Sequence, residues 1–363
     1  MIFQTFGFIG LGLIGGSIAR AVRNTCAGAQ LIAYDPDAAS LKEALAGGVL
    51  DVAADGIDER FAACDVIFLC APVAHNDENL EAVKKVLAPE AILTDIGSVK
   101  TDIHEHIRAA GLAPQFIGGH PMAGSERTGF RNSKAKLLEN AYYILAPEPE
   151  VSAEKAASFT ALVAMLGAIP LVLDYRRHDY ATAAVSHVPH VVSASLVRLL
   201  EESDDSRGLM KMIAAGGFKD ITRISSSSPV MWQQICLTNA ENILPLLDRY
   251  IADLQQIRAG IADHDAAALY DFFDGARRYR DSFSDLGSGP IARAFLLHMD
   301  IPDRPGVLAE VFELLAREGV NVKNISIQHN REYEEGVLRI ELHTEEGLEK
   351  AREVLTENGY LLH

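Results

Sequence analysis

The sequence predicts three consecutive parts: a doubly wound α/β sheet over residues 1–174, an all-helical part over residues 175–283, and a small α+β domain over residues 291–363. In the first part, short apolar runs alternate with helical patterns, as in a mostly parallel sheet. Long helical patterns without strand alternation then follow. A polar, glycine-rich and proline-ended segment at residues 284–290 marks the last boundary. The 363 residues suffice for two or three separate cores.

The first strand, residues 6–9, runs into the segment GLGLIGGS and then into a helical pattern. Gly10 permits a tight turn, and Gly12 lets a pyrophosphate approach the backbone. Gly15 lets the helix pack closely on the strand. The predicted cofactor contacts of this loop are Gly10, Gly12, Leu13, Ile14 and Gly15.

A second strand, residues 31–34, ends in Asp35. An acidic side chain at this place accepts hydrogen bonds from the adenosine ribose, and its charge repels a 2′-phosphate. Together with the glycine loop, Asp35 predicts a Rossmann-type domain that binds NAD rather than NADP.

Further strands are expected near the following residues: 66–70, 92–94, 116–117, 142–145 and 171–173. In such sheets ligands bind beyond the carboxyl ends of the strands. Three polar stretches fall at these ends and should surround the nicotinamide: Ala71 with Pro72, residues 95–98, and the segment that contains His120.

His120 is the candidate for the chemical step. It lies in a predicted turn, GGHPMAGSE, between glycines that let substrate and backbone come close. An imidazole can accept a proton near neutral pH. The alternative is a histidine that only hydrogen-bonds the turn. Ser98 could orient a substrate hydroxyl or His120, or it could cap the helix that begins at Lys100.

The helical part carries the segment SHVPH, in which His187 and His190 lie three residues apart and so near one face of a helix. Pro189 is expected to kink this helix. Because no third ligand stands at a convincing spacing, the sequence predicts no metal site. Substrate contact or a core hydrogen bond is favoured for both histidines.

Because the net charge is −17, an anionic substrate must be bound by locally placed basic residues, and we expect a buried arginine among them. Arg223, in GGFKDITR, is suited to hold a carboxylate in bidentate fashion. The alternative is a structural pair with Asp220. Trp232, the single tryptophan, could be a core residue or the wall of an aromatic pocket.

Composition also limits the partners and the compartment. The acidic balance disfavours nucleic acid and anionic membrane surfaces. The four cysteines include no CxxC pair, which favours a reducing, cytoplasmic setting. No basic leader precedes the first strand, and the longest apolar run, residues 66–74, is too short to cross a bilayer.

The C-terminal part shows the order strand, helix, strand, strand, helix, strand, which is typical of a ferredoxin-like domain. Its strands are expected at residues 295–301, 321–328, 337–343 and near Tyr360, and its helices at residues 307–318 and 346–357. Gly306 stands at the start of a helix and leaves room for a ligand beside that helix N-terminus, and Asn321 begins the next strand.

Taken in order, these motifs resemble those of the prephenate dehydrogenases, NAD-dependent enzymes of tyrosine biosynthesis. The resemblance spans nearly the whole chain and rests on GLGLIGGS, TDIGSVK, GGHPMAGSE, SHVPH, GGFKDITRI and the MW pair. The C-terminal run DRPGVLAEVFELLAREGVNVKNI resembles an ACT domain, a module that often binds amino acids.

The resemblance implies that His120 polarises the ring hydroxyl of prephenate while hydride leaves the same carbon for NAD and CO2 is lost. Ser98 would support His120, Arg223 would hold a carboxylate, and His190, with His187, would line the pocket. Further substrate contacts or orienting groups would be Glu126, Gly216, Asp220, Ser227 and Trp232. The resemblance also implies a homodimer through the helical domains and feedback inhibition by tyrosine through the ACT domain, which could instead be a dimerisation module without a ligand.

Other functions remain open from the sequence alone. A β-hydroxyacid dehydrogenase would use a lysine of the helical part, and Lys211 and Lys219 are available, but neither explains the His120 segment. Arogenate could replace prephenate as the substrate. A sensor that only binds NAD and an amino acid would need an output surface, and no basic DNA-reading stretch is present.

Overall fold

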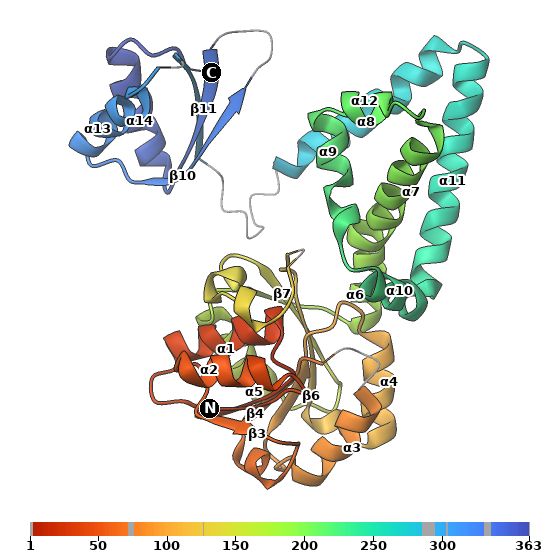
Figure 1. The fold of residues 1–363 in the computed structure, drawn as a ribbon, viewed down its shortest axis with the longest axis vertical. Coiled ribbons are helices and arrows are strands. Elements are labelled where there is room, and N and C mark those ends of the chain that lie inside the picture. The colour runs from red at the N-terminus through yellow and green to blue at the C-terminus, as the bar shows by residue number, and fades with distance from the viewer. Residues whose placement is uncertain are drawn as a thin grey trace. The chain divides into compact units, whose positions relative to one another are not determined.

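The computed structural model describes residues 3–71, 76–125, 127–284, 295–302, 304–329 and 335–362. The chain divides into two compact units, Met1–Phe272 and Phe273–His363 (Figure 1). The first unit contains a sheet domain followed by helices, and the second contains a small antiparallel sheet with two helices.

The sheet domain has eight strands in the order β3-β2-β1-β4-β5-β6-β7-β8. Neighbouring strands are parallel except β6 and β7, which are antiparallel. This confirms the doubly wound fold predicted from the sequence. The strands are β1 (Thr5–Ile9), β2 (Gln30–Tyr34), β3 (Val52–Ala54), β4 (Val66–Leu69), β5 (Ile92–Asp95), β6 (Phe116–Pro121), β7 (Tyr142–Pro147) and β8 (Ile169–Val172).

Helices cover both faces of this sheet (Figure 1). Alternate side chains of each strand point to opposite faces, so Phe8 and Phe68 join one core and Ile67 and Leu69 the other. Phe8 and Phe68 stack with ring centroids 5.1 Å apart. The first face carries α1 (Leu13–Thr25), α2 (Ala38–Ala46) and α5 (Ala153–Met165), and the second carries α3 (Asn76–Val86) and α4 (Thr101–Ala110).

The helical part begins with α6 (Tyr175–Thr182), which is continued by a π-helical turn, Ala183–His187, and by α7 (Val188–Ser203). The irregularity therefore precedes Pro189, which was expected to kink the helix. Pro189 lies in the first turn of α7, where a missing backbone N–H costs little. The other helices are α8 (Leu209–Ile213), α9 (Gly216–Thr222), α10 (Pro229–Thr238), α11 (Ala240–Ala262) and α12 (Ala266–Asp281).

The helices of this part bury few apolar side chains within the chain. Their core comprises Ala183, Val188 and Ile243 with a few half-buried neighbours. Along α11, by contrast, four large apolar side chains are exposed: Leu244, Ile251, Leu254 and Ile261. Their spacing follows a seven-residue repeat, which is typical of a helix that packs along another helix.

The helical segment Tyr175–Ser203 is, by length and composition alone, long and apolar enough to span a membrane. It is not one continuous apolar run, because serine, histidine and proline interrupt it. However, His178 and Asp179 of this segment are fully buried and contact residues of the sheet domain. These contacts identify the segment as a helix of the globular first unit.

The second unit contains β9 (Phe295–Pro302), α13 (Val307–Arg317), β10 (Val322–His329), β11 (Glu335–Leu342) and α14 (Glu345–Glu357). The three strands form an antiparallel sheet in the order β10-β11-β9, as a ferredoxin-like domain requires. The last predicted strand, near Tyr360, is reduced to a single bridge between Met299 and Leu362. Leu297, Val311 and Leu355 lie at the centre of the core of this unit.

Candidate active site

The glycine loop between β1 and α1 has the shape that a dinucleotide needs. Gly10 has a φ of 94°, and a Cβ there would lie 2.7 Å from the backbone nitrogen of Ala71. A Cβ at Gly15 would lie 2.9 Å from the Cβ of Cys70, so α1 packs directly on the sheet. A Cβ at Gly12, in contrast, would meet nothing within 4 Å. The loop is therefore closed on the protein side and open at Gly12.

Asp35 lies beside this loop at the end of β2. Its carboxylate accepts hydrogen bonds from the backbone nitrogens of Leu11 (2.5 Å) and Asp37 (2.7 Å). Helix α1 begins at Leu13 and has no side-chain cap, so the N–H groups of its first turn, Ile14 included, can bind an anion. Loop, helix end and carboxylate fit a dinucleotide. Pro72, also predicted to contact the cofactor, lies outside the described residues.

His120 lies on strand β6, and not in a turn as the sequence suggested, because β7 pairs with it and places Ile144 opposite. The two glycines before it are needed for packing. A Cβ at Gly118 would lie 2.6 Å from Nε2 of His104, and a Cβ at Gly119 would collide with the carbonyl oxygen of Asp95. The glycines therefore let β6 pack closely against its neighbours.

A chain of hydrogen bonds extends from His120 into the helical part. Its Nδ1 lies 2.7 Å from Nε2 of His178, and Nδ1 of His178 lies 2.7 Å from Oδ1 of Asp179. Within the described part of the chain, Nε2 of His120 has no hydrogen-bond partner. Burial, followed by the charges of His178, Lys100 and His187, holds the pKa of His120 well below its usual value. His120 is therefore a neutral base at neutral pH.

Asp179 accepts three further hydrogen bonds, from the backbone nitrogens of Lys100 (2.8 Å) and Thr101 (2.7 Å) and from Oγ1 of Thr101 (2.6 Å). It thus caps helix α4, which corrects the alternative prediction that Ser98 does so. Burial raises the pKa of Asp179, but its hydrogen bonds, first that of His178, outweigh burial and lower the pKa overall. Asp179 therefore stays ionised.

A buried ion pair between Lys100 and Asp95 stabilises the segment that carries Ser98. The side chain of Lys100 is fully buried and its Nζ donates to Asp95. Asp95 also accepts hydrogen bonds from the backbone nitrogens of Gly97 (2.9 Å) and Gly119 (3.0 Å). These bonds join the end of β5 to β6. Ser98 itself is half-buried and, as far as the described residues show, makes no hydrogen bond to His120.

His187 is buried, and its Nδ1 lies 3.0 Å from Nδ2 of Asn239. The same amide nitrogen donates to the carbonyl oxygen of Asp179 at 2.9 Å. Because Asn239 donates to Nδ1, neutral His187 carries its proton on Nε2. Burial, with the neighbouring histidines His178 and His190, lowers the pKa of His187 to about 4, although Asp179 opposes the shift.

His190 and Trp232 stack with ring centroids 3.6 Å apart. The backbone carbonyl of Ser186 accepts a hydrogen bond from Nδ1 of His190 at 2.8 Å, so Nε2 of His190 is an acceptor. Burial and the charge of Arg223 lower the pKa of His190. Nε1 of Trp232 is buried and lacks a hydrogen-bond partner among the described atoms. The two rings form a flat wall beside Arg223.

Arg223 is exposed, which corrects the expectation of a buried arginine. Within the described ranges no ion pair joins it to Asp220, so the structural alternative is not seen. Gly216 and Asp220 are exposed on α9, and Ser227 donates to the carbonyl oxygen of Ile224 at 2.8 Å. Glu126 lies outside the described residues. The described residues include no group of three side chains able to hold a metal ion.

In the second unit, Gly306 precedes α13 with a φ of 92°, and no side chain caps this helix. Asn321 is exposed immediately before β10. Arg304 forms an ion pair of 2.5 Å with Glu310 on the first turn of α13. The unsatisfied N–H groups of that turn are a place where a ligand carboxylate could bind.

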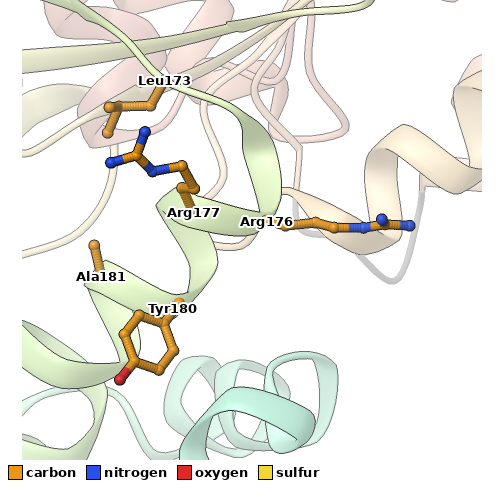
Figure 2. A pocket seen from close by; sticks show the side chains of 5 residues that line it. All are labelled: Leu173, Arg176, Arg177, Tyr180 and Ala181. Carbon is orange, nitrogen blue, oxygen red and sulfur yellow. The ribbon is translucent and has the colours of Figure 1, made fainter.

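A surface cavity of about 420 Å³ lies beside helix α6 (Figure 2). On one face of α6, Tyr175, His178, Asp179 and Thr182 are buried. On the other face, exposed side chains line the cavity, and Figure 2 shows Arg176 and Arg177 pointing in different directions. The cavity contains no residue predicted to act in the reaction. Its lining residues are Leu173, Arg176, Arg177, Tyr180 and Ala181.

Comparison with known proteins shows the family. Residues 18–170 match the nucleotide-binding domain of prephenate dehydrogenase, residues 174–274 match its dimerization domain, and residues 296–359 match the ACT domain. The chain belongs to the prephenate dehydrogenase family. Prephenate dehydrogenase of Bacillus subtilis is 36% identical over 97% of this chain and 95% of its own length.

Two solved structures are also similar to the first two domains of this family member. Prephenate dehydrogenase from Aquifex aeolicus, in complex with hydroxyphenyl propionate and NAD+, has a TM-score of 0.72 at 28% identity, over 77% of this chain and 98% of its own. Arogenate dehydrogenase from Synechocystis has a TM-score of 0.69 at 29% identity, over 77% of this chain and 100% of its own.

These findings confirm the resemblance to the family, the three-part fold class and the prediction that the protein is an oxidoreductase. The NAD prediction is confirmed through the nucleotide-binding domain and the complex of the Aquifex enzyme. The roles given to single residues, and the domain boundaries at residues 174 and 283, stay predictions.

Four residues of the site were not assigned to it from the sequence: Lys100, His178, Asp179 and Asn239. A signal for two of them was present. His178 and Asp179 share the buried face of α6 with Tyr175 and Thr182, at the spacing of one helix face. Polar, ionisable residues on the apolar face of a helix indicate a functional or structural site.

Proposed function

We propose that this protein converts prephenate to 4-hydroxyphenylpyruvate, CO2 and NADH, in the biosynthesis of tyrosine. The observation that carries the proposal is His120: a neutral imidazole on β6 whose Nε2 has no protein partner within the described residues. An oxidation of a secondary alcohol needs such a base at the hydroxyl.

In the proposed reaction, Nε2 of His120 accepts the proton of the ring hydroxyl as the C–H bond at the same carbon breaks. Bound NAD supplies the acceptor for that hydride. The bond between the ring and its carboxylate then breaks, and CO2 leaves as the ring becomes aromatic. The electron pair of that bond enters the ring and reaches the ring oxygen, which takes the proton back from His120 to give the phenol. Aromatisation drives this last step, so the residues only need to hold the substrate in position.

Substrate binding is assigned to four residues of the helical part: His187, His190, Arg223 and Trp232. His187 offers an N–H at Nε2, and Arg223 offers a guanidinium that has no ion pair within the described ranges. An arginine can hold a carboxylate in bidentate fashion, and prephenate carries two carboxylates. The flat pair of His190 and Trp232 suits a planar ring.

Arogenate is the second candidate substrate, because the similar Synechocystis protein is an arogenate dehydrogenase. The two substrates share the ring and differ by a keto or an amino group on the side chain. Prephenate is preferred because the Bacillus subtilis relative, matched over nearly the whole chain, is a prephenate dehydrogenase.

The test is NADH formation by the purified full chain with NAD and either substrate, with the product identified by chromatography. We expect prephenate to give 4-hydroxyphenylpyruvate. Turnover of arogenate alone to tyrosine would keep the mechanism and change the substrate. Absence of turnover with both substrates would refute the proposal.

We also propose a homodimer formed through the helical domain. The exposed apolar side chains of α11 support it, since the chain alone leaves them in water, and the matched family domain is a dimerization domain.

For the ACT domain we propose inhibition by tyrosine, bound near Gly306 and Asn321. The four free cysteines support a reducing compartment, and we propose the cytoplasm.

A further inference from the structure

The three groups Asp179, His178 and His120 form one continuous hydrogen-bonded chain that ends at the proposed reaction centre. The two links are each 2.7 Å long, and the rings of His120 and His178 meet nearly edge to face at 78°. The side chains of His178 and Asp179 are fully buried. Water therefore does not compete for the link between His178 and Asp179.

The carboxylate of Asp179 determines which atom is the donor in each of these two hydrogen bonds. Asp179 is ionised and can only accept hydrogen bonds, so Nδ1 of His178 must donate. In neutral His178 the other nitrogen, Nε2, is then an acceptor, and it faces Nδ1 of His120. His120 must therefore carry its proton on Nδ1, which leaves the lone pair on Nε2.

We propose that His178 and Asp179 are positioning residues that hold His120 in this tautomer, with Nε2 unprotonated and directed to the substrate hydroxyl. This inference rests on the proposed function of His120 and adds residues that no sequence motif singled out.

The same chain also stabilises the charge that the reaction creates. When Nε2 of His120 accepts the hydroxyl proton, the O–H bond breaks, an N–H bond forms, and the ring becomes an imidazolium. Its Nδ1–H then donates to His178, which is itself polarised by Asp179. An acceptor at this place favours the charged ring, as in other carboxylate–histidine arrangements.

The two positioning residues differ in how much the fold depends on them. Asp179 also caps α4 through Lys100 and Thr101, so its removal would disturb folding. His178 has no such second task in its side chain: both of its ring nitrogens are used within the chain from Asp179 to His120. His178 is therefore the residue to change.

The molecule offers a matched control. His104 is another fully buried histidine, with Nδ1 2.5 Å from a buried carboxylate, that of Glu148. It stacks on Tyr175 and is not among the hydrogen-bond partners that the described residues offer to His120. Replacing either histidine by leucine breaks the same kind of pair, and in both cases the carboxylate keeps other donors. Of these two histidines, His178 is the one hydrogen-bonded to the base.

The experiment compares His178→Leu, His178→Gln and His104→Leu in the full chain. We expect His178→Leu to lower kcat roughly 10²-fold, which is the scale of losing a correctly oriented base. The KM values for NAD and for prephenate should each change less than about threefold. His178→Gln should recover roughly a tenth or more of the wild-type kcat, since its amide oxygen can accept from Nδ1 of His120. His104→Leu should stay within about threefold of the wild type in kcat.

A second readout needs no substrate. In ¹⁵N NMR spectra of histidine-labelled enzyme, with His120 assigned by its absence from His120→Asn, we expect the proton on Nδ1, and its transfer to Nε2 in His178→Leu. A wild-type proton on Nε2, or equal kcat in His178→Leu and His104→Leu, would overturn the inference. If His178→Leu does not fold, the wild-type spectrum decides. Failure of the wild type to oxidise prephenate would refute the proposed function, whereas the spectrum still tests the chain of hydrogen bonds.

Discussion

The residue whose chemistry is determined most strongly by its neighbours is His120. Burial, and after it the electrostatic interactions with His178, Lys100 and His187, disfavour its protonated form. A base that must accept a proton from an alcohol has to be unprotonated beforehand. The lowered pKa therefore makes the active form the dominant one over the whole neutral range.

This lowered pKa predicts the pH dependence of catalysis. The neutral form of His120 is present above its pKa and is lost as the pH falls through it. The acid limb of kcat/KM should thus lie well below pH 6.5, the ordinary value for histidine. A pH profile measured at saturating NAD checks this. An acid limb centred at or above the ordinary value would contradict the assignment of His120 as a base that is already unprotonated at neutral pH.

Replacement of His120 tests its role directly. His120→Asn keeps a polar side chain on β6 but removes the proton acceptor, and kcat should fall by a factor of ~10² or more. His264→Asn is a suitable control, because His264 is exposed and has a φ of 54°, which asparagine adopts easily. Steady-state kinetics of both variants are compared with the wild type. A kcat of His120→Asn near that of the control would remove His120 from the chemical step.

At the scale of elements, the turn from β1 to α1 separates packing glycines from a binding glycine. Gly10 and Gly15 are surrounded by protein, whereas a side chain at Gly12 would point into open space. The Gly12→Val variant should therefore fold normally, and its new side chain should obstruct the bound pyrophosphate.

We expect Gly12→Val to raise KM for NAD at least about tenfold, equivalent to about 1.4 kcal/mol, without a change in thermal stability. Gly56→Val is the matched control, because a Cβ at Gly56 also meets nothing within 4 Å and lies in the same domain. NAD titration by fluorescence and thermal melting of both variants check this. Equal NAD affinity in the two variants would exclude Gly12 from the cofactor site.

Most elements could be predicted from the sequence, because the apolar runs of a buried parallel sheet are continuous and distinctive. Strand β3 (Val52–Ala54) was missed, since three residues at the sheet edge give too short a signal. His120 was placed in a turn because its glycines suggested one. In the structure those glycines allow close packing of β6, and the pairing with β7 decides the conformation.

The candidate site could be predicted only where a motif concentrates it locally. The glycine loop and Asp35 lie together, with the backbone nitrogen of Leu11 donating to Asp35, because both belong to one supersecondary unit. The contact of His178 with His120, 58 positions away, depends on how α6 packs against the sheet domain. The same holds for the cap that Asp179 provides to α4, which no local pattern around Ser98 could reveal.

At the scale of the whole molecule, the exposed stripe on α11 supports the proposed dimer. Ile251→Glu combined with Leu254→Glu would place charges in an apolar interface, and the dimer should weaken at least about 10²-fold. Leu45→Glu, at an exposed leucine of α2 in the sheet domain, is the control. Analytical ultracentrifugation over a concentration series measures the association. A double variant that remains as dimeric as the control would place the interface elsewhere.

Regulation by tyrosine can be tested through two glycines at opposite ends of α13. Gly306 precedes the helix with a φ of 92°, and Gly319 follows it with a φ of 70°, so alanine at either position strains the backbone similarly. Only Gly306 orients the free N–H groups to which the amino acid would bind. Gly306→Ala should weaken inhibition by tyrosine at least about tenfold, whereas Gly319→Ala should retain it. Inhibition curves of the full chain decide between a bound effector and a domain that only dimerises: an equal response of both variants would show that the N-terminus of α13 binds no tyrosine.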